Sequence, residues 1–442
     1  MALGLVIAAP ASGSGKTAIT LALLALARRR GVGVSSAKVG PDYIDPAFHA
    51  AATGRPCFNL DGWAMRPRAL LAALTEAASG AEALLVEGVM GLFDGAARGP
   101  GGADGSTADL AARFGLPVVL VVNAKGQGAT AAAVLEGLAR HRADVRVAGV
   151  IFNRVGGAGH RAILAAAAEA AHIPVFGFLP SLPALALPQR HLGLRQASEI
   201  AGLDAFLAAA ADAIAPHVDL SGLLRLGAPI GNAGGDALPG LPPLGQRIAV
   251  ARDVAFAFAY PAQLEAWRRA GAALSFFSPL ADEAPQADAD AVYLPGGYPE
   301  LHAGRLAGNS CYQQGLRAAA ARGAFVYGEC GGYMVLGETL TDADGAEHAM
   351  AGLLPIATSF AQPRLHLGYR RARLLEPSPL GGRAASFAAH EFHYATIAQE
   401  DGEAAPFQAS DSQGRDLGRL GARRANVMGS FLHLIDRASP DL

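Results

Sequence analysis

The stretch LGLVIAAPASGSGKT, residues 3–17, decides the fold of the N-terminal half of the chain. It begins as a short apolar strand, continues as a turn of small residues and ends in GKT at the start of a helical stretch. Small residues let backbone N–H groups surround phosphate oxygens, and the N-terminus of the following helix favours an anion. The stretch therefore predicts a phosphate-binding strand–loop–helix unit, although Pro10 stands where an ordinary P-loop has its first glycine.

The residues at the end of this loop have distinct expected roles. Lys16 is predicted to reach the outer phosphates of a nucleotide, and the Thr17 hydroxyl is predicted to join Mg²⁺. Lysines are rare in the chain, and a compact ammonium suits a tight phosphate site better than a guanidinium fork. The predicted nucleotide-binding residues of the loop are Ser12, Gly13, Ser14, Gly15, Lys16 and Thr17.

Three further segments place a carboxylate or an amide at the end of a predicted strand. The strand ALLV ends in Glu87, the segment KVGPDYIDP holds Asp42 and Asp45, and Asn153 follows another strand. An acid at the carboxyl end of a parallel strand beside the phosphate loop is well placed to hold Mg²⁺. The predicted metal ligands are therefore Thr17, Asp45 and Glu87, and the Asn153 amide is predicted to read the adenine edge.

The first half alternates apolar strands with helical stretches, which is typical of a parallel sheet covered on both faces. The predicted strands are 3–9, 33–38, 83–87, 117–123, 145–152 and 174–178, and the predicted helices include 18–30, 108–114 and 129–141.

A second α/β pattern follows a segment that is rich in Gly and Pro and has no periodicity. This segment, residues 222–246, is predicted to be a linker. We therefore expect an α/β protein of two domains, an N-terminal P-loop domain over residues 1–221 and a C-terminal domain over residues 247–442.

The segment YGECGGY places Cys330 between glycines at a predicted strand-to-helix junction. Such a turn lifts a nucleophile above a sheet, and a helix N-terminus favours the thiolate. The earlier segment LPGGYPE contains Gly296 and Gly297, whose N–H groups are predicted to stabilise an oxyanion, worth roughly 3–4 kcal/mol of barrier per donor. His433, at the end of the chain, is the predicted general base.

Other histidines and cysteines receive no catalytic assignment. In the segment HEFH, residues 390–393, the histidines are spaced i,i+3 in a β-like region rather than i,i+4 on a helix, so we assign no metal there. Cys57 and Cys311 lack a glycine-flanked turn and are expected to be buried packing residues.

Composition excludes several classes of protein. The net charge of −2 and the absence of a basic cluster argue against a nucleic-acid binder. No apolar run reaches the roughly 20 residues that span a bilayer, and no basic leader precedes the first apolar stretch. Three cysteines without a paired spacing suit a reducing compartment, so we expect a cytoplasmic enzyme, and a homodimer is left open.

Together these motifs make the chain resemble the cobyrinic acid a,c-diamide synthase family of corrin biosynthesis, including its branch that acts on hydrogenobyrinic acid. The resemblance covers nearly the whole length. The segments that carry it are APASGSGKT (9–17), KVGPDYIDP (38–46), VEGVMGLFDG (86–95), PQRHLGL (188–194), LPGGYPE (294–300), GECGG (328–332), HEFHY (390–394) and GSFLHL (429–434).

The resemblance implies a dethiobiotin-synthetase-like ATP domain joined to a class I glutamine amidotransferase domain. It implies that ATP and Mg²⁺ phosphorylate the a and c acetate carboxylates of a corrinoid polyacid, and that glutamine-derived ammonia displaces the phosphate. In this family the glutaminase works with a Cys–His pair, here Cys330 and His433, without the usual third acid. Candidate contacts to the polyanionic substrate are Lys38, Asp42, Arg190 and His191.

Several alternatives stay open at this point. The substrate is either metal-free hydrogenobyrinic acid, which the segment APASGSGKT favours, or cobalt-containing cobyrinic acid. Cobyric acid synthase and nickel-sirohydrochlorin a,c-diamide synthase are the nearest other enzymes. Two alternatives to an amide-forming ligase are a partition-type ATPase switch and a binding module with an inert glutaminase. The glycine-flanked Cys330 argues against both of these.

Overall fold

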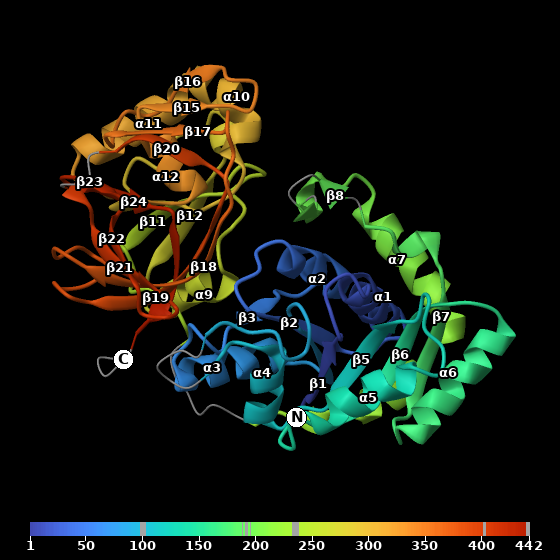
Figure 1. Cartoon of the computed structure of the whole chain (residues 1–442). Coiled ribbons are helices and arrows are strands. Elements are labelled where there is room, and N and C mark those ends of the chain that lie inside the picture. The colour runs from blue at the N-terminus through green and yellow to red at the C-terminus, as the bar shows by residue number, and fades with distance from the viewer. Residues whose placement is uncertain are drawn as a thin grey trace. The chain divides into compact units, whose positions relative to one another are not determined.

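The computed structural model describes residues 1–97, 103–187, 189–190, 193–194, 196–231, 238–400 and 404–438 (Figure 1). It forms two compact units: Met1–Trp63 with Pro67–Asp236, and Ala64–Arg66 with Ala237–Leu442. In the part of the chain described, no helix combines the length and the apolar character that crossing a membrane requires.

The first unit is built on a parallel sheet in the order β3-β2-β4-β1-β5-β6-β7, with β10 antiparallel at β1 (Figure 1). Because all strands but β10 run the same way, the turns that follow β1, β2, β4 and β6 meet at one edge. The strands are β1 (Leu3–Ala8), β2 (Val34–Val39), β3 (Phe58–Leu60), β4 (Ala83–Glu87), β5 (Val118–Asn123), β6 (Val147–Val155), β7 (Val175–Pro180) and β10 (Ala228–Pro229).

Helix α1 (Lys16–Arg29) begins directly at the end of the glycine-rich turn, and its middle nine residues, Ile19 to Ala27, are all buried. Its apolar residues pack with β1, β4 and β5 in one core. The other helices are α2 (Asp45–Thr53), α3 (Pro67–Ala78), α4 (Thr107–Phe114), α5 (Ala131–Arg140), α6 (Ala158–Ala170), α7 (Leu203–Ile214) and α8 (Leu220–Arg225). Short elements between β7 and α8 are η1 (Pro183–Leu185), β8 (Gln189–Arg190), β9 (Gly193–Leu194), η2 (Ala197–Glu199) and η3 (Ala215–His217).

The described residues of the second unit form three sheets. Its central sheet, in the order β12-β11-β13-β14-β24-β23, is parallel except at β23. These strands are β11 (Arg247–Ala251), β12 (Ala273–Phe277), β13 (Ala291–Leu294), β14 (Phe325–Glu329), β23 (Ala422–Arg424) and β24 (Val427–Ser430). Its helices are α9 (Pro261–Arg269), η4 (Pro279–Ala281), η5 (Pro299–His302), α10 (Ala303–Gly308), α11 (Ser310–Ala321) and α12 (Gly331–Leu336).

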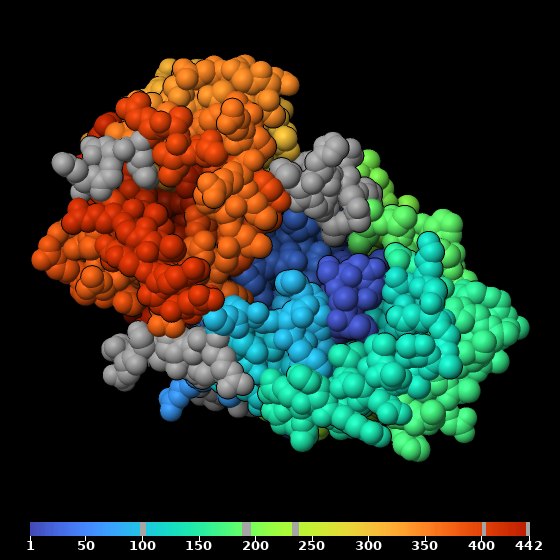
Figure 2. Space-filling view, in the orientation of Figure 1, coloured from blue at the N-terminus to red at the C-terminus, as the bar shows by residue number. Residues whose placement is uncertain are grey.

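An antiparallel sheet, in the order β22-β21-β18-β19-β25, shares a core with one face of this central sheet. Trp267 of α9, Tyr293 and Tyr327 fill that core together with Phe387 and Phe407 of the antiparallel sheet. The antiparallel strands are β18 (His366–Leu374), β19 (Ser386–His393), β21 (Phe407–Asp411), β22 (Asp416–Leu420) and β25 (Leu432–Arg437). A smaller sheet holds β15 (Thr339–Thr341), β16 (Glu347–Ala349), β17 (Ile356–Ser359) and β20 (Thr396–Glu400). On the face of this unit seen in Figure 2, the orange to red C-terminal strands form most of the surface.

The architecture confirms the predicted α/β fold of two parts. Every strand predicted in the first half is present, most within one or two residues, and the strand 291–294 is reproduced as β13. The segment predicted as a linker is partly regular, because α8 ends inside it and β10 follows. Those two elements belong to the first unit, where β10 adds an edge pairing to β1.

The buried helix α1 offers a test of what holds the first unit together. Leu23→Ala removes a fully buried side chain and leaves a cavity, so we expect the free energy of unfolding to fall by about 2–5 kcal/mol. Urea denaturation gives this value. Ile163→Ala, at a helical position that is 48% exposed, is the matched control, and a loss below about 1 kcal/mol is expected there.

Candidate functional site

The glycine-rich turn after β1 adopts the conformation that a phosphate loop needs. Gly13 and Gly15 have φ of 79° and 91°, in the left-handed region that favours glycine. A Cβ atom at Gly15 would lie 2.4 Å from Nδ2 of Asn153, so a side chain at this position would displace that amide. The Asn153 amide donates a hydrogen bond to the carbonyl of Ser14 (2.9 Å) and so fixes the turn from the neighbouring strand.

Behind the loop, two lysines and two acids form a buried cluster. The Lys38 ammonium lies 2.5 Å from Asp45 Oδ2 and 2.9 Å from Glu87 Oε1, and Lys16 lies 3.5 Å from the same Glu87 oxygen. The Thr17 hydroxyl donates to Glu87 Oε1 at 2.6 Å and lies 3.3 Å from Asp45 Oδ2. The start of α1, the end of β2, the end of β4 and the start of α2 therefore bring these side chains to one point.

Burial and charge act against each other in this cluster. Burial disfavours the ionised form of Glu87, but Lys38 and Lys16 hold its pKa well below the usual value. Burial likewise opposes the charge on Lys38, yet Asp45 and Glu87 raise its pKa well above the usual value. The pKa of Asp45 is raised to about 6, first by burial and then by the nearby Asp42. Lys38 is thus paired with both acids, and of the two carboxyls only Asp45 has a raised pKa.

His49 belongs to the same cluster and was not predicted. It is fully buried, and its Nε2 lies 2.6 Å from Glu87 Oε2, the oxygen that the lysines leave free. Burial opposes protonation of the ring, but Cys57 and Glu87 beside it raise the pKa of His49 to about 10. The spacing of Asp45 and His49 could have revealed it, because residues four apart on a helix share a face.

The donor set of this cluster fits Mg²⁺ held beside a nucleotide. Thr17, Asp45 and Glu87 present three oxygen atoms at a common point, and hard oxygen ligands are what this ion prefers. The two lysines add positive charge for phosphate oxygens. The predicted ligands of the metal therefore lie together, as do the loop residues from Ser12 to Thr17.

The other site residues predicted in the first unit lie outside this buried cluster or make other contacts. Asp42 Oδ1 accepts the N–H groups of Ile44 and Asp45 (2.8 and 3.0 Å), so this carboxylate caps the start of α2. The Asn153 amide donates to the carbonyl of Ser14 and accepts the backbone N–H of Arg154, and one N–H and one lone pair of the amide remain for a ligand. His191 and the side chain of Arg190 lie outside the described residues.

In the second unit, the predicted nucleophile elbow is present. Cys330 joins β14 to α12 with φ of 47° and ψ of −104°, a strained conformation for a residue with a side chain. A Cβ atom at Gly332 would lie 1.9 Å from the carbonyl oxygen of Leu294, so the tight approach of α12 to β13 requires glycine. The same strand–turn–helix geometry exposes the nucleophile of other hydrolases.

Gly296 and Gly297, the predicted oxyanion residues, adjoin this elbow. A Cβ atom at Gly296 would lie 2.4 Å from Cε1 of His433 and 3.3 Å from Cβ of Cys330. At Gly297 it would lie 1.9 Å from the carbonyl oxygen of Ala255. Glycine is therefore required at both positions, and Cys330 and His433 meet at the same turn.

The predicted charge state of the Cys330 thiol has to be corrected. The sequence predicted that the helix N-terminus favours the charged thiol, but burial, with Glu300 next, raises the pKa of the Cys330 thiol above its usual value. Helix α12 is only six residues long and cannot offset this effect. Burial also lowers the pKa of His433 to about 3, with His390 adding to it, so its imidazole is neutral at neutral pH and can accept a proton.

The residue before the nucleophile is a buried acid, although the sequence supplied no third catalytic acid. Glu329 accepts hydrogen bonds from the hydroxyls of Tyr293 (2.8 Å) and Tyr327 (3.1 Å). The N–H of Leu434 donates to the same carboxylate at 3.2 Å. Oε2 of Glu329 lies 4.0 Å from Nδ1 of His433.

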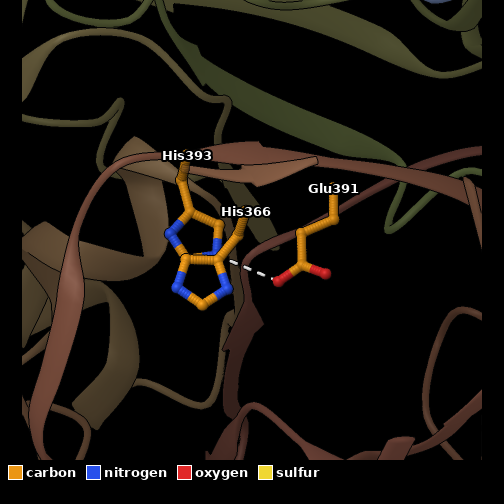
Figure 3. A group of neighbouring side chains, drawn as sticks. All are labelled: His366, Glu391 and His393. Atoms are coloured by element: carbon orange, nitrogen blue, oxygen red, sulfur yellow. Dashed lines mark hydrogen bonds and ion pairs between the residues drawn. The ribbon is translucent and has the colours of Figure 1, made fainter. Parts of the chain in front are cut away.

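The HEFH segment lies on β19, where Glu391 and His393 share a face and meet His366 of β18 (Figure 3). Their donor atoms lie within 4.8 Å of one another. The rings of His366 and His393 are stacked, with 4.6 Å between centroids and 4° between planes, so their lone pairs do not converge on a common ion. Arg370 donates to Glu391 at 2.7 Å, and His393 Nε2 lies 3.0 Å from the same carboxylate, which makes the group an ion-pair cluster.

The two remaining cysteines differ from each other. Cys57 is buried, as predicted, whereas Cys311 is exposed, which corrects its assignment as a packing residue. Cys311 is the second residue of α11, and its side chain faces solvent because the buried face of that helix is formed by Tyr312, Gln313, Leu316 and Ala319.

The ion-pair cluster predicts a pH dependence of stability. Burial alone would raise the pKa of Glu391, but His393 and Arg370 lower it to about 2. A depressed pKa stabilises the fold above the ordinary value of 4.5, and this contribution is lost as the pH falls toward 2. We expect Glu391→Gln to lower the free energy of unfolding by roughly 2–3 kcal/mol at pH 6 and by much less at pH 3.

Urea denaturation at both pH values measures this difference. Glu347→Gln, which changes an exposed acid of β16, is the control and should give the same small effect at both. A loss for Glu391→Gln that does not change with pH would contradict the ion-pair interpretation.

Two family models match the chain. Residues 5–194 match the CobQ/CobB/MinD/ParA nucleotide binding domain, which includes the glycine-rich loop and the acid cluster. Residues 247–440 match the CobB/CobQ-like glutamine amidotransferase domain, which includes the Cys330 elbow and His433.

Curated relatives match over almost the whole length. Hydrogenobyrinate a,c-diamide synthase of Sinorhizobium sp is 54% identical over 437 residues, which are 98% of this chain and 99% of the relative. The enzyme of the same name from Brucella abortus is 56% identical over 441 residues, 98% of both chains. That from Rhodobacter capsulatus is 54% identical over 433 residues, again 98% of both. With this identity and mutual coverage, the chain belongs to the hydrogenobyrinate a,c-diamide synthase family.

Proposed function

We propose that the protein converts the a and c acetate carboxylates of hydrogenobyrinic acid into amides, with ATP as the energy source and glutamine as the nitrogen donor. One observation carries this proposal. The same chain holds a buried cluster of acids and lysines suited to a nucleotide and a glycine-flanked Cys330 close to His433. The names of the full-length relatives support the choice of substrate.

The first unit supplies the activating half of this reaction. Lys16 and the turn from Ser12 to Gly15 hold the phosphates of ATP, and Thr17, Asp45 and Glu87 would hold Mg²⁺. The bound ion would neutralise charge on the phosphates during transfer. A substrate carboxylate oxygen attacks the γ-phosphorus, ADP leaves, and an acyl phosphate forms. Ammonia then attacks the acyl carbon and expels inorganic phosphate, which leaves the amide.

The second unit supplies ammonia. The Cys330 sulfur attacks the side-chain carbon of glutamine while His433 accepts the thiol proton, and N–H groups of the turn at Gly296 and Gly297 face the developing oxyanion. His433 returns the proton to the nitrogen, ammonia leaves, and a thioester remains. Water hydrolyses the thioester to glutamate and the free thiol. Because the thiol is uncharged at rest, proton transfer accompanies the attack rather than preceding it.

The substrate is held through its carboxylates. A polycarboxylate requires cationic partners, and Lys38, Arg190 and His191 supply such groups along the chain. Lys38 is already paired with Asp45 and Glu87, so it acts on the substrate by adjusting the charge of the activating site. Asp42 acts indirectly, because it caps the helix that carries Asp45.

We further propose a cytoplasmic enzyme that needs small-molecule partners only. Its three cysteines are free, as expected where thiols remain reduced. A homodimer stays a proposal. Cobyrinic acid is the second candidate substrate, because it differs from hydrogenobyrinic acid by its cobalt and carries the same carboxylates.

Two variants separate the two halves of the reaction. We expect Cys330→Ala to lose more than 99% of glutamine-driven amidation of hydrogenobyrinic acid, because the nucleophile is missing, and to keep the reaction driven by ammonium salt. Lys16→Ala should lose both, because each needs the acyl phosphate. Product amides are quantified by mass spectrometry, with the wild type and an exposed variant, Lys125→Ala, as controls.

If Cys330→Ala still uses glutamine at the rate of the wild type, the glutaminase assignment is wrong. If the wild type amidates cobyrinic acid and leaves hydrogenobyrinic acid unchanged, the proposed substrate is wrong and the second candidate replaces it.

A further inference from the structure

Glu329 is an acid in an interior where an unpaired charge would be costly. It is 1% exposed and stands at the end of the central strand β14, directly before the nucleophile. Two tyrosine hydroxyls and one backbone N–H donate to its carboxylate, and none of these donors is a cation. Burial raises the pKa of Glu329 to about 7, although the three donors lower it. Packing alone does not require an ionisable group at this position.

The carboxylate lies near the catalytic base. The N–H of Leu434, the residue after His433, binds Oε1, so Glu329 is fixed to the same strand β25 that carries His433. Its other oxygen, Oε2, lies 4.0 Å from Nδ1 of His433. This distance is longer than a hydrogen bond, but catalytic hydrogen bonds commonly tighten only when substrate is bound.

The chemistry of the glutaminase needs a negative charge at this point. When glutamine is attacked, a neutral thiol and a neutral imidazole become a tetrahedral adduct and an imidazolium; the thioester forms later, when ammonia leaves. The imidazolium is buried, and a carboxylate at Nδ1 both orients the ring and stabilises that charge. In other cysteine and serine hydrolases the orienting acid is a separate residue far along the chain; here the chain offers it at the position before the nucleophile.

Other charged groups near the site fit this role less well. His390 lies opposite His433 on β19, and together with His393 it disfavours the imidazolium. Glu391 favours it but already pairs with Arg370 and His393. Glu300 acts on the Cys330 side of the site. Glu329 is the acid whose oxygen faces Nδ1.

We propose that Glu329 is the third member of the glutaminase, a positioning residue that orients His433 through Nδ1 and stabilises its protonated form. Nε2 then takes the proton of the Cys330 thiol and passes it to the departing ammonia. No proton is transferred to Glu329. The inference rests on the proposed glutaminase function, and wild-type hydrolysis of glutamine tests that function separately.

The test measures glutamine hydrolysis by Glu329→Gln between pH 5.5 and 9.5, with glutamate as the product detected. We expect kcat to fall by roughly 100-fold across the range, with KM for glutamine within about twofold, because the loss falls on the transition state. Ammonium-driven amidation should be unchanged. Glu338→Gln, an exposed acid after α12, is the matched control and should behave as the wild type.

The variant Tyr293→Phe provides a second test, in which Glu329 itself is unchanged. Removing the hydroxyl that donates to Oε2 raises the pKa of Glu329 further, so the acidic limb of the kcat profile should move to higher pH. The rate should recover at alkaline pH, which a merely structural defect would not show. In Glu329→Gln this recovery should be missing.

Alkylation of Cys330 by iodoacetamide in a Cys311→Ser background follows the thiol directly. The proposal expects Glu329→Gln to slow alkylation by about tenfold near neutral pH, because the imidazolium that accompanies the thiolate is less stable. Wild-type kcat in Glu329→Gln, or a Tyr293→Phe profile that falls without shifting along the pH axis, would overturn the role of Glu329. If the wild type itself hydrolyses no glutamine, the proposed function fails instead.

Discussion

A carboxylate buried at the end of a central parallel strand has to be satisfied inside the protein, and each half of this chain is organised around one such group. Glu87 ends β4 and Glu329 ends β14, and both are nearly inaccessible to solvent. Glu87 is satisfied by cations and a hydroxyl, and Glu329 by two phenols and a backbone amide. The two groups differ in charge because cations keep Glu87 ionised, whereas burial raises the pKa of Glu329 to about 7 and its neutral donors offset this only in part.

Both sites also depend on glycine where two chain segments approach closely. The turn at Gly15 touches the Asn153 amide, and the turn at Gly297 touches the Ala255 carbonyl. In the proposed reaction the backbone of each turn has to come within reach of a ligand, phosphate in one unit and oxyanion in the other. Both units therefore use the same arrangement at the proposed anion site, a strand followed by small residues and a helix.

Much of the fold and of the two candidate sites could be predicted from the sequence because their motifs are local. The strand–loop–helix at residues 3–17 and the elbow around Cys330 are contiguous, so periodicity and glycine placement suffice to predict them. His366 and Glu329 could not be found in this way, and His49 could be found only from its helical spacing to Asp45. His366 and Glu329 become part of a cluster only through partners on other strands, and each is a common residue in an ordinary local context. The direction of the Cys330 pKa was predicted wrongly because burial is a property of the whole fold, whereas the helix N-terminus is visible in the sequence.

The neutral resting thiol has a consequence for the durability of the enzyme in the cell. Peroxides oxidise thiolates far faster than thiols, so a nucleophile that stays protonated until glutamine arrives is protected from sulfenic acid formation. Exposed Cys311 lacks the burial that protects Cys330. Oxidative damage to this protein should therefore begin at a cysteine that takes no part in the chemistry, and the glutaminase should outlast it.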